Sequence, residues 1–148
     1  MKPPVNAADQ ALQTEVAAFF DAFVQAFLSF DGKVIAKRYA APYLALNGEG
    51  ALTLLPTQAD IASYFQTVLD NYFAEGCRSC RYLELEVLAI GSQSGMSTVT
   101  WEMLDQNGKV LSSWRESYNF MRTEDGLRIF ASTDHVDGHA ASLVHRGQ

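Results

Sequence analysis

Two β-hairpin signals follow one another in the C-terminal third of this chain, and they constrain the fold more than any other feature. Asn107-Gly108 and Asp125-Gly126 favour tight hairpin turns, because both positions accept a positive φ angle at low cost. Around them, apolar and polar residues alternate as they do in strands with one buried face. The pattern predicts a β-meander with strands at about 97–104, 110–122 and 127–134.

A two-residue loop at the Asn-Gly turn sets the register of the first hairpin. Counting back from it places Trp101 opposite Trp114 and Val99 opposite Glu116. One face of the pair is then almost entirely apolar and aromatic. Its members are Val99, Trp101, Met103, Val110, Trp114, Glu116, Tyr118 and Phe120. A single carboxylate within this face is the feature that calls for a functional explanation.

The second hairpin decides which residue of the last strand faces Glu116. A loop of even length places His135 on that face, and we prefer this register because it also turns the apolar residues of the last strand inward. A three-residue loop with a bulge places Asp134 there instead.

The residues around Glu116 indicate acid–base chemistry. Apolar surroundings raise the pKa of a carboxyl group, and a neighbouring imidazolium lowers it again. Such a pair transfers protons near neutral pH. Glu116, His135 and, in the alternative register, Asp134 are therefore the candidate catalytic residues. The competing interpretation is a structural hydrogen-bonded pair, or a pair at the wet rim of a pocket.

Several tyrosines and both tryptophans are candidates for lining a pocket. Each offers a large apolar surface with one polar atom to orient a flat ligand. The set consists of Tyr39, Tyr43, Tyr64, Trp101, Trp114 and Tyr118. The alternatives are an ordinary core or, if the inner and outer faces are reversed, a contact between two copies of the chain.

Three helices are expected before the meander. The first spans about 7–30, with apolar residues at three- and four-residue steps. Asp31 can cap a short second helix to about Tyr39, and Thr57 can cap a third that ends before Gly76. Helices that precede the strands predict an α+β fold, with a curved antiparallel or mixed sheet packed on the three helices as a cone.

Two further strand regions complete the expected elements. A weak hairpin spans 43–55, between the second and third helices, and another strand spans 82–90. No segment has the composition of a linker, so residues 1–148 predict a single domain. Its ordered core is expected at about 8–135, followed by a mobile tail at 136–148.

The charge of the chain excludes some classes of partner. The net charge is −6, and the basic residues form no cluster larger than Lys37-Arg38, which argues against binding to nucleic acid or to an anionic membrane surface. No apolar run approaches the roughly 20 residues of a membrane span. The first residues lack the apolar core of a signal peptide, so a cytoplasmic location is expected.

The cysteines and histidines do not indicate a metal or a cofactor. Cys77 and Cys80 have CxxC spacing, but zinc needs about four ligands and no second pair exists. The pair also follows a helix C-terminus, whereas redox motifs place the reactive thiol at a helix N-terminus. His135 and His139 lie at a strand end next to glycine, without fixed ligand geometry.

Three local patterns, together with the order of elements, resemble the NTF2-like superfamily over about residues 8–135. They are Phe30-Asp31-Gly32-Lys33 after the Phe-rich helix, Thr57–Ile61, and the run Tyr118–Arg122, Glu124–Ile129 and Asp134-His135. The superfamily includes SnoaL-type polyketide cyclases and ketosteroid isomerases. The resemblance implies a cystatin-like cone with a pocket between sheet and helices, an acidic base on the sheet wall at Glu116, and a homodimer through the outer sheet face.

The functional prediction is a protein that binds a small apolar or aromatic molecule in this pocket. One alternative is a cofactor-free isomerase, cyclase or dehydratase, with Tyr118 or Tyr43 donating a hydrogen bond to a developing enolate. The other alternative is a protein-interaction module whose cone is filled by side chains. The volume behind Glu116 distinguishes these predictions.

Overall fold

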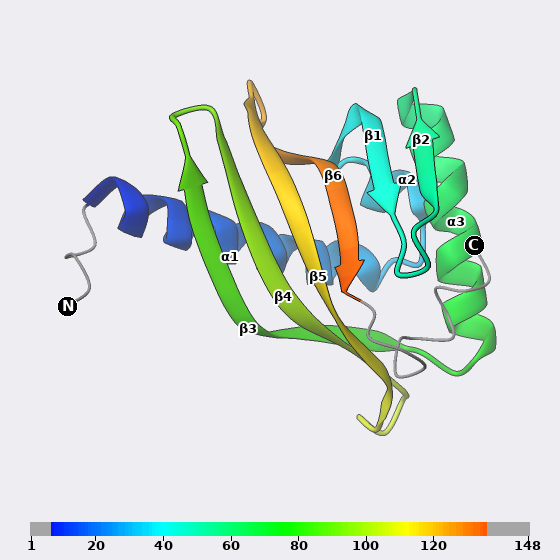
Figure 1. Ribbon diagram of the computed structural model, residues 1–148. Coiled ribbons are helices and arrows are strands. Elements are labelled where there is room, and N and C mark those ends of the chain that lie inside the picture. The colour runs from blue at the N-terminus through cyan, green and yellow to red at the C-terminus, as the bar shows by residue number, and fades with distance from the viewer. Residues whose placement is uncertain (1–6, 136–148) are drawn as a thin grey trace.

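The computed structural model describes residues 7–135. Three helices and six strands occur there in the α+β order that the sequence predicts (Figure 1). They are α1 (Ala7–Phe27), α2 (Gly32–Ala36), β1 (Tyr39–Leu46), β2 (Leu52–Leu55), α3 (Gln58–Ala74), β3 (Ser79–Ile90), β4 (Ser94–Leu104), β5 (Val110–Thr123) and β6 (Gly126–His135). The expected tail at 136–148 lies outside the described residues.

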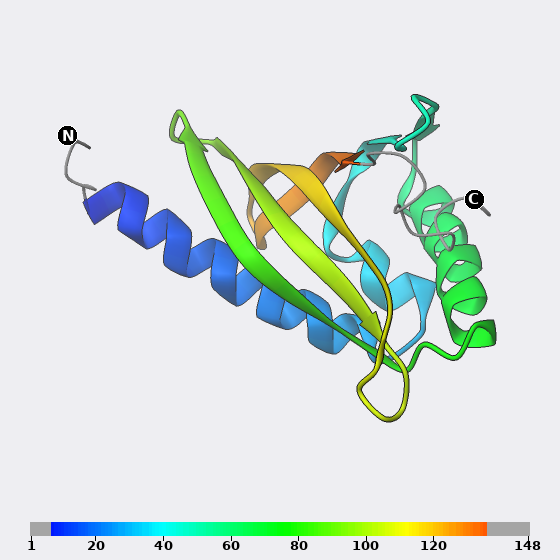
Figure 2. The ribbon, with the colours of Figure 1, turned by 60° about the horizontal axis from the view of Figure 1, so that its bottom comes forward.

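The strands form one mixed, six-stranded sheet in the order β2-β1-β6-β5-β4-β3. The β1–β6 pair is parallel and the other neighbouring pairs are antiparallel. Figure 2 shows α1 running across one face of the strongly twisted sheet, while α2 and α3 lie together beyond β1. Because α1 covers this face and α3 stands at the β1–β2 end of the sheet, the sheet and the helices enclose a central region where the inner side chains meet.

Local signals at the helix ends act as predicted. The Asp31 carboxylate accepts a hydrogen bond from the backbone N–H of Lys33 at 2.8 Å and caps α2. The Thr57 hydroxyl accepts from the N–H of Asp60 at 3.1 Å and caps α3. After α3, Gly76 has a φ of 97° and donates to a carbonyl of the last helical turn, as glycine does in a Schellman motif.

Gly32 allows α2 to approach α3 closely. A Cβ added to Gly32 would lie 2.2 Å from the carbonyl oxygen of Ala62, a distance that no side chain tolerates. The N–H of Gly32 donates to Oε1 of Gln66 at 2.7 Å, and Nε2 of Gln66 donates to the carbonyl of Phe30 at 3.1 Å. The glycine and this glutamine thus hold the two helices that cover one end of the sheet.

The predicted register of the first hairpin is confirmed over its central part. Trp101 pairs with Trp114 and Val99 pairs with Glu116. The turn is wider than a two-residue loop, and a bulge near the start of β5, where Leu111 is the extra residue, restores the count. A bulge reverses the faces beyond it, so Val110 lies 38% exposed and does not join the inner face.

The second hairpin departs from the preferred prediction because β6 contains a bulge. Phe120 pairs with Ile129, whereas the preceding residue, Asn119, pairs with Ala131, so Phe130 is one residue more than β5 can match. Such an extra residue exchanges the two faces of a strand for all positions beyond it. The first half of β6 therefore turns its apolar residues inward as predicted, while the second half has the opposite alternation.

Because of this bulge, His135 does not lie where the sequence predicted. Glu116 pairs with Asp134, and His135 pairs with Arg115 on the outer face. The His135 ring is exposed, and its Nε2 lies 2.6 Å from the hydroxyl oxygen of Ser117. The expected contact of His135 with Glu116 is wrong, and Asp134 takes that place, which the alternative register allowed.

Some element boundaries also differ from the predictions. Tyr39, expected near the end of the second helix, begins β1. The β1–β6 register is irregular between Tyr39 and Leu44, which accommodates Pro42, a residue without an N–H to pair. The first helix ends at Phe27, three residues before the expected end near Phe30. Within residues 7–135, none of the helices combines the length and apolarity required to cross a lipid bilayer.

Candidate functional site

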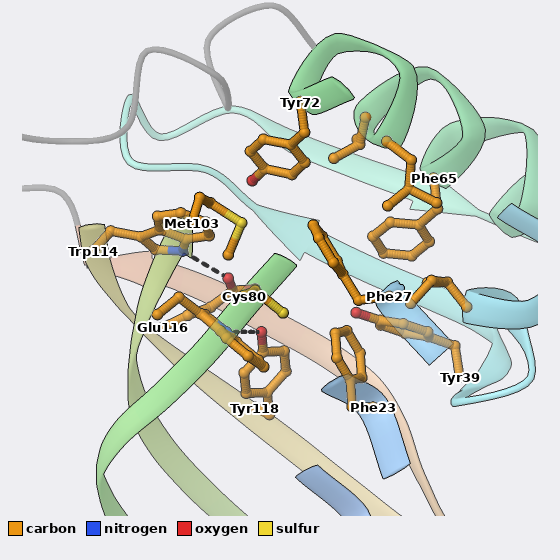
Figure 3. Close-up of a pocket in the computed structure, with 14 residues that line it drawn as sticks. Phe23, Phe27, Tyr39, Phe65, Tyr72, Cys80, Met103, Trp114, Glu116 and Tyr118 are labelled. Carbon is orange, nitrogen blue, oxygen red and sulfur yellow. Dashed lines mark hydrogen bonds between the residues drawn. The ribbon is translucent and has the colours of Figure 1, made fainter. Parts of the chain in front are cut away.

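A small cavity lies where the inner face of the sheet meets α1 and α3 (Figure 3). Its volume is about 60 Å³, and apolar and aromatic side chains dominate its wall. They are Phe23, Phe27, Ile35, Tyr39, Phe65, Val68, Leu69, Tyr72, Cys80, Trp101, Met103, Trp114 and Tyr118, with the carboxyl group of Glu116 among them. The expected single carboxylate in an aromatic wall is therefore present.

Glu116 is held by donors on its own strand. It is 7% exposed, and the indole Nε1 of Trp114 donates to its Oε1 at 2.9 Å. Tyr118, on the other side along β5, also forms a hydrogen bond with the carboxyl group. The phenol oxygen of Tyr118 accepts the indole N–H of Trp101 at 2.7 Å, so its own proton is available for Glu116. Alternate positions of one strand thus deliver both donors to one carboxylate.

Asp134 supplies a second carboxyl group. It pairs with Glu116 across β5 and β6, and a side-chain hydrogen bond joins the two groups. Burial, followed by the charge of Asp134, raises the pKa of Glu116 well above its usual range, while the hydrogen bonds from Trp114 and Tyr118 act in the opposite direction. Glu116 therefore keeps its proton to higher pH than an exposed glutamate does, because a negative charge at this buried position beside Asp134 is costly.

A second, more polar cavity of about 40 Å³ adjoins the first. It lies between the β1–β2 hairpin, α3 and the end of β6. Its wall comprises Tyr43, Ala45, Leu46, Asn47, Thr53, Tyr64, Phe65, Glu116, Ser132 and Asp134. The hydroxyl groups of Tyr43 and Ser132 are 2.5 Å apart within it. Glu116 and Phe65 belong to both walls, so the carboxyl group of Glu116 stands at the boundary between an apolar and a polar compartment.

The aromatic residues named from the sequence divide between the two cavities. The apolar cavity contains Tyr39, Trp101, Trp114 and Tyr118 in its wall, and the polar cavity contains Tyr43 and Tyr64. Figure 3 shows Tyr39 and Tyr72 directed toward the same space as Glu116, from β1 and α3. His135, on the outer face, belongs to neither wall.

Several residues of the site have no distinguishing signal in the sequence. Phe65 and Tyr72 belong to the apolar stripe of α3, a pattern that identifies a buried face without distinguishing a pocket from a core. Cys80 lies in the wall of the apolar cavity as a free, buried thiol, and burial raises its pKa. Ser132 had no signal, because only the bulge in β6 turns it inward.

The tyrosine hydroxyl groups of the site are proton donors that stay neutral. Burial raises the pKa of Tyr39, Tyr43, Tyr72 and Tyr118 well above its usual range, and the nearby charge of Glu116 acts in the same direction. None of the described residues in the two walls is Lys, Arg or His. Residues 9–135 also contain no group of three or more His, Cys, Asp or Glu side chains arranged to hold a metal ion.

A twisted mixed sheet packed on three helices is the arrangement of the cystatin-like class of α+β proteins. The chain belongs to the family described as NTF2-like protein (DUF6841), whose model matches residues 14–137. This confirms the family and fold that the sequence patterns indicate. No curated protein matches the chain.

Solved structures of low sequence identity share this fold. An NTF2-like protein from Novosphingobium aromaticivorans is 15% identical and superposes with a TM-score of 0.67 over 98% of this chain and 97% of that one. Aln2 from a Streptomyces species is 18% identical, with a TM-score of 0.68 over 99% and 100%. A protein of unknown function from Nostoc punctiforme is 12% identical, with a TM-score of 0.69 over 93% and 97%. At these identities, the likeness concerns the fold alone.

Proposed function

We propose that this NTF2-like protein binds a small, mostly apolar molecule within the cone, with a polar group of the ligand at Glu116. The observation that supports this most is the position of that carboxyl group on the boundary between the two cavities. Ligand sites are typically apolar concavities with a few convergent polar groups, and this arrangement has that character. A cavity of about 60 Å³ also argues against a cone filled completely by side chains, the interaction-module alternative.

The volume restricts the ligand. A water molecule needs roughly 15 Å³ of such space, so about 60 Å³ accommodates a group of a few heavy atoms without rearrangement. A benzene-sized ring fills a cavity of about 150 Å³, so an aromatic ligand requires side chains to move apart. Met103, which has a flexible unbranched side chain in the wall, is suited to such movement.

Methionine-methyl NMR tests this proposal with controls within the same molecule. In protein labelled with ¹³C at the methionine methyl groups, a ligand in the cone shifts the signal of Met103. The signals of Met96 and Met121 should stay in place, since these residues point away from the cavity, with Met121 38% exposed. A Met103→Leu variant assigns the signal. If a chemically diverse set of small molecules shifts no Met103 signal, the proposal is wrong.

A proton-transfer enzyme is a second candidate, favoured by the contact between Glu116 and Asp134. In this mechanism, the carboxyl pair removes a proton from the carbon next to a carbonyl group. Once Glu116 holds that proton, the O–H of Tyr118 turns from Glu116 to donate a hydrogen bond to the enolate oxygen. Tyr43, the other phenol considered, lies in the polar compartment beside Ser132. His135, on the outer face, has no part in this step.

Deuterium exchange tests the second candidate. Small aldehydes and ketones that shift the Met103 signal are incubated in D₂O, and deuterium incorporation beside the carbonyl group is measured by NMR. The protein should accelerate exchange, and Glu116→Gln should abolish the acceleration while binding persists. Equal exchange with and without the protein removes this candidate.

A homodimer through the outer sheet face is part of the proposal. Leu44 of β1 pairs with Leu54 of β2, and these side chains are 39% and 57% exposed on this face. Leu52, also in β2, is 65% exposed. Exposed apolar groups of this kind mark interaction surfaces when they are contiguous. Sedimentation should give about twice the chain mass of 16.3 kDa, and Leu54→Glu should halve it. A monomeric wild-type protein at micromolar concentration contradicts this part.

A cytoplasmic location is also proposed. Its support is that Cys77 and Cys80, three positions apart, are both free thiols, as expected in a reducing compartment. Cell fractionation with an antibody to the chain tests it, and recovery in a secreted or membrane fraction overturns it.

A further inference from the structure

We infer that the chain has a second binding site, on its surface, where Lys37, Arg38 and Arg128 bind the dianionic phosphate group of inorganic phosphate or of a small phosphate ester. This site is separate from the cavities of the cone and independent of the ligand proposed for them. It is an open groove of about 420 Å³ where the end of α2, the start of α3 and the β5–β6 turn meet. Gln58 and Asp125 also line the groove.

The fold brings these three basic residues together from distant parts of the sequence. Lys37 and Arg38 directly follow α2, whereas Arg128 lies in β6, near the other end of the chain. The backbone N–H of Ile129 donates to the carbonyl of Arg38 at 3.1 Å, and Tyr39 pairs with Ile129 where β1 meets β6. Each arginine comes one residue before a buried member of that pair, so the two arginines are neighbours at the edge of the core.

The charges of the two arginines are not balanced by neighbouring acids. Elsewhere in the protein, Arg81, Arg115 and Arg122 each form an ion pair with a glutamate. Arg38 and Arg128 form no ion pair with any acidic residue that the structure describes. Partial burial, followed by the charge of Arg128, lowers the pKa of Arg38, because two adjacent cations repel each other. An anion bound in the groove would relieve this repulsion.

Contacts with the protein hold both guanidinium groups in place. The central carbon of the Arg38 guanidinium lies over the ring of Phe19, 5.3 Å from the ring centroid. Nη1 of Arg128 donates to the carbonyl of Leu127 at 2.6 Å. Each guanidinium has five N–H donors, and these contacts occupy few of them. The remaining donors form planar forks, a geometry that matches the oxygen atoms of a phosphate group.

The balance of charge in the groove favours a dianion. Of the described residues that line it, three are cationic and one, Asp125, is acidic, so the lining has a net charge of about +2 at neutral pH. A phosphate monoester carries about −1.5 to −2 at pH 7, which matches this charge better than a single carboxylate does.

The size of the groove and the charge of the whole chain restrict the ligand to small molecules. A groove of about 420 Å³ has room for a phosphate group and for part of the molecule that carries it. Nε2 of Gln58 donates to the carbonyl of Tyr39 at 2.8 Å, and its second N–H can donate to a phosphate oxygen. The net charge of −6 repels a polyanion such as a nucleic acid, so three basic residues favour a single phosphate group.

Arginine side-chain NMR tests the inference with a control within the same molecule. Ethyl phosphate, inorganic phosphate, acetate and ethanol are each titrated into ¹⁵N-labelled protein at about pH 7.5, where a phosphate monoester is a dianion. Both phosphates should shift the Nε–H signals of Arg38 and Arg128. The signal of Arg81, which is paired with Glu102 across β3 and β4, should stay in place.

The relative affinities of the probes identify the ligand chemistry. Both phosphates should bind more tightly than acetate by about five-fold, the factor that one further unit of charge supplies at contact distance in water. Tighter binding of ethyl phosphate than of inorganic phosphate assigns the site to phosphate esters, and the reverse order assigns it to the free ion. Equal or tighter binding of acetate or ethanol overturns the inference, as does the absence of a shift at both arginines.

Charge variants of the groove provide an independent test. Lys37→Gln and Arg128→Gln each remove one cation and should weaken the binding of ethyl phosphate by about five-fold. Asp125→Asn removes the acid and should strengthen it by a similar factor; Asp125 is exposed, so this variant remains informative even if a substitution of Arg128 disturbs folding. Lys109→Gln, an exposed position in the turn at the opposite end of β5, is the matched control and should leave the affinity unchanged. A weaker affinity in Asp125→Asn, or equal losses in Lys37→Gln and Lys109→Gln, overturns the inference.

Discussion

The buried carboxyl group of Glu116 makes a quantitative prediction about stability. We expect Glu116→Gln to remove most of the dependence of the unfolding free energy on pH between about pH 5 and 8. The amide is close in shape to the protonated carboxyl group. Its oxygen still accepts the N–H of Trp114, and its NH₂ group can donate to Asp134. The variant therefore mimics the protonated site at every pH.

The sign follows from the direction of the pKa shift. The pKa of Glu116 is higher in the folded protein than in the unfolded chain, where it is about 4.3, so the folded state binds a proton more tightly. The corresponding stability is complete below about pH 4 and is lost as the pH rises toward the folded pKa. Over that window, the wild-type protein loses up to about 1.4 kcal/mol per pH unit. For a chain of 148 residues, this is a fall in Tm of about 3–6 °C per unit.

Urea denaturation followed by tryptophan fluorescence measures this effect, because Trp101 and Trp114 are both buried. The two proteins should have similar stability near pH 4, and the Gln variant should become the more stable one as the pH rises. Glu124→Gln, at an exposed turn position, should follow the wild-type profile. Parallel profiles for wild type and Glu116→Gln over the whole range would refute the claim that this group is buried with a raised pKa.

Three other predictions concern packing and accessibility. Gly32→Ala places a Cβ 2.2 Å from a backbone oxygen of α3, so we expect the unfolding free energy to fall by about 2–4 kcal/mol in urea denaturation. A fall below about 0.5 kcal/mol would contradict the close approach of α2 to α3. Tyr118→Phe deprives the buried indole N–H of Trp101 of its acceptor at 2.7 Å, which should cost about 1–3 kcal/mol in the same assay; an unchanged midpoint means that another acceptor exists. The thiols of Cys77 and Cys80 are 1% and 5% exposed with raised pKa values, so Ellman's reagent should react with them at the rate of unfolding, and rapid labelling of the folded protein would show that they are accessible.

The sequence contains enough information for the helices and the central register. The caps at Asp31 and Thr57 are local patterns whose geometry depends on a few neighbouring residues, and both predictions are confirmed. The predicted pairing of Trp101 with Trp114 is also confirmed, although it results from a wider turn and a bulge that offset each other. These features depend on interactions between residues close in the chain or separated by a single hairpin.

The composition of the site depends on information that a single sequence lacks. The extra residue at Phe130 has no local signal, because Phe and Ala are ordinary strand residues and no glycine marks the bulge. Because of that one irregularity, Asp134 lies beside Glu116 where His135 was predicted. The cavity volume is equally inaccessible, since it depends on how side chains from α1, α3 and the sheet fill the same space.

The bulge has a consequence for how such sites diverge. A relative with the same residues but a regular last strand would turn Thr133 and His135 inward in place of Ser132 and Asp134. It would then present an acid and an imidazole on the inner face. A register shift of one residue thus replaces two inward-facing side chains, a change that would otherwise require two point mutations. A sequence alignment of distant homologues therefore misassigns the residues of such a site unless the β-bulges are aligned first.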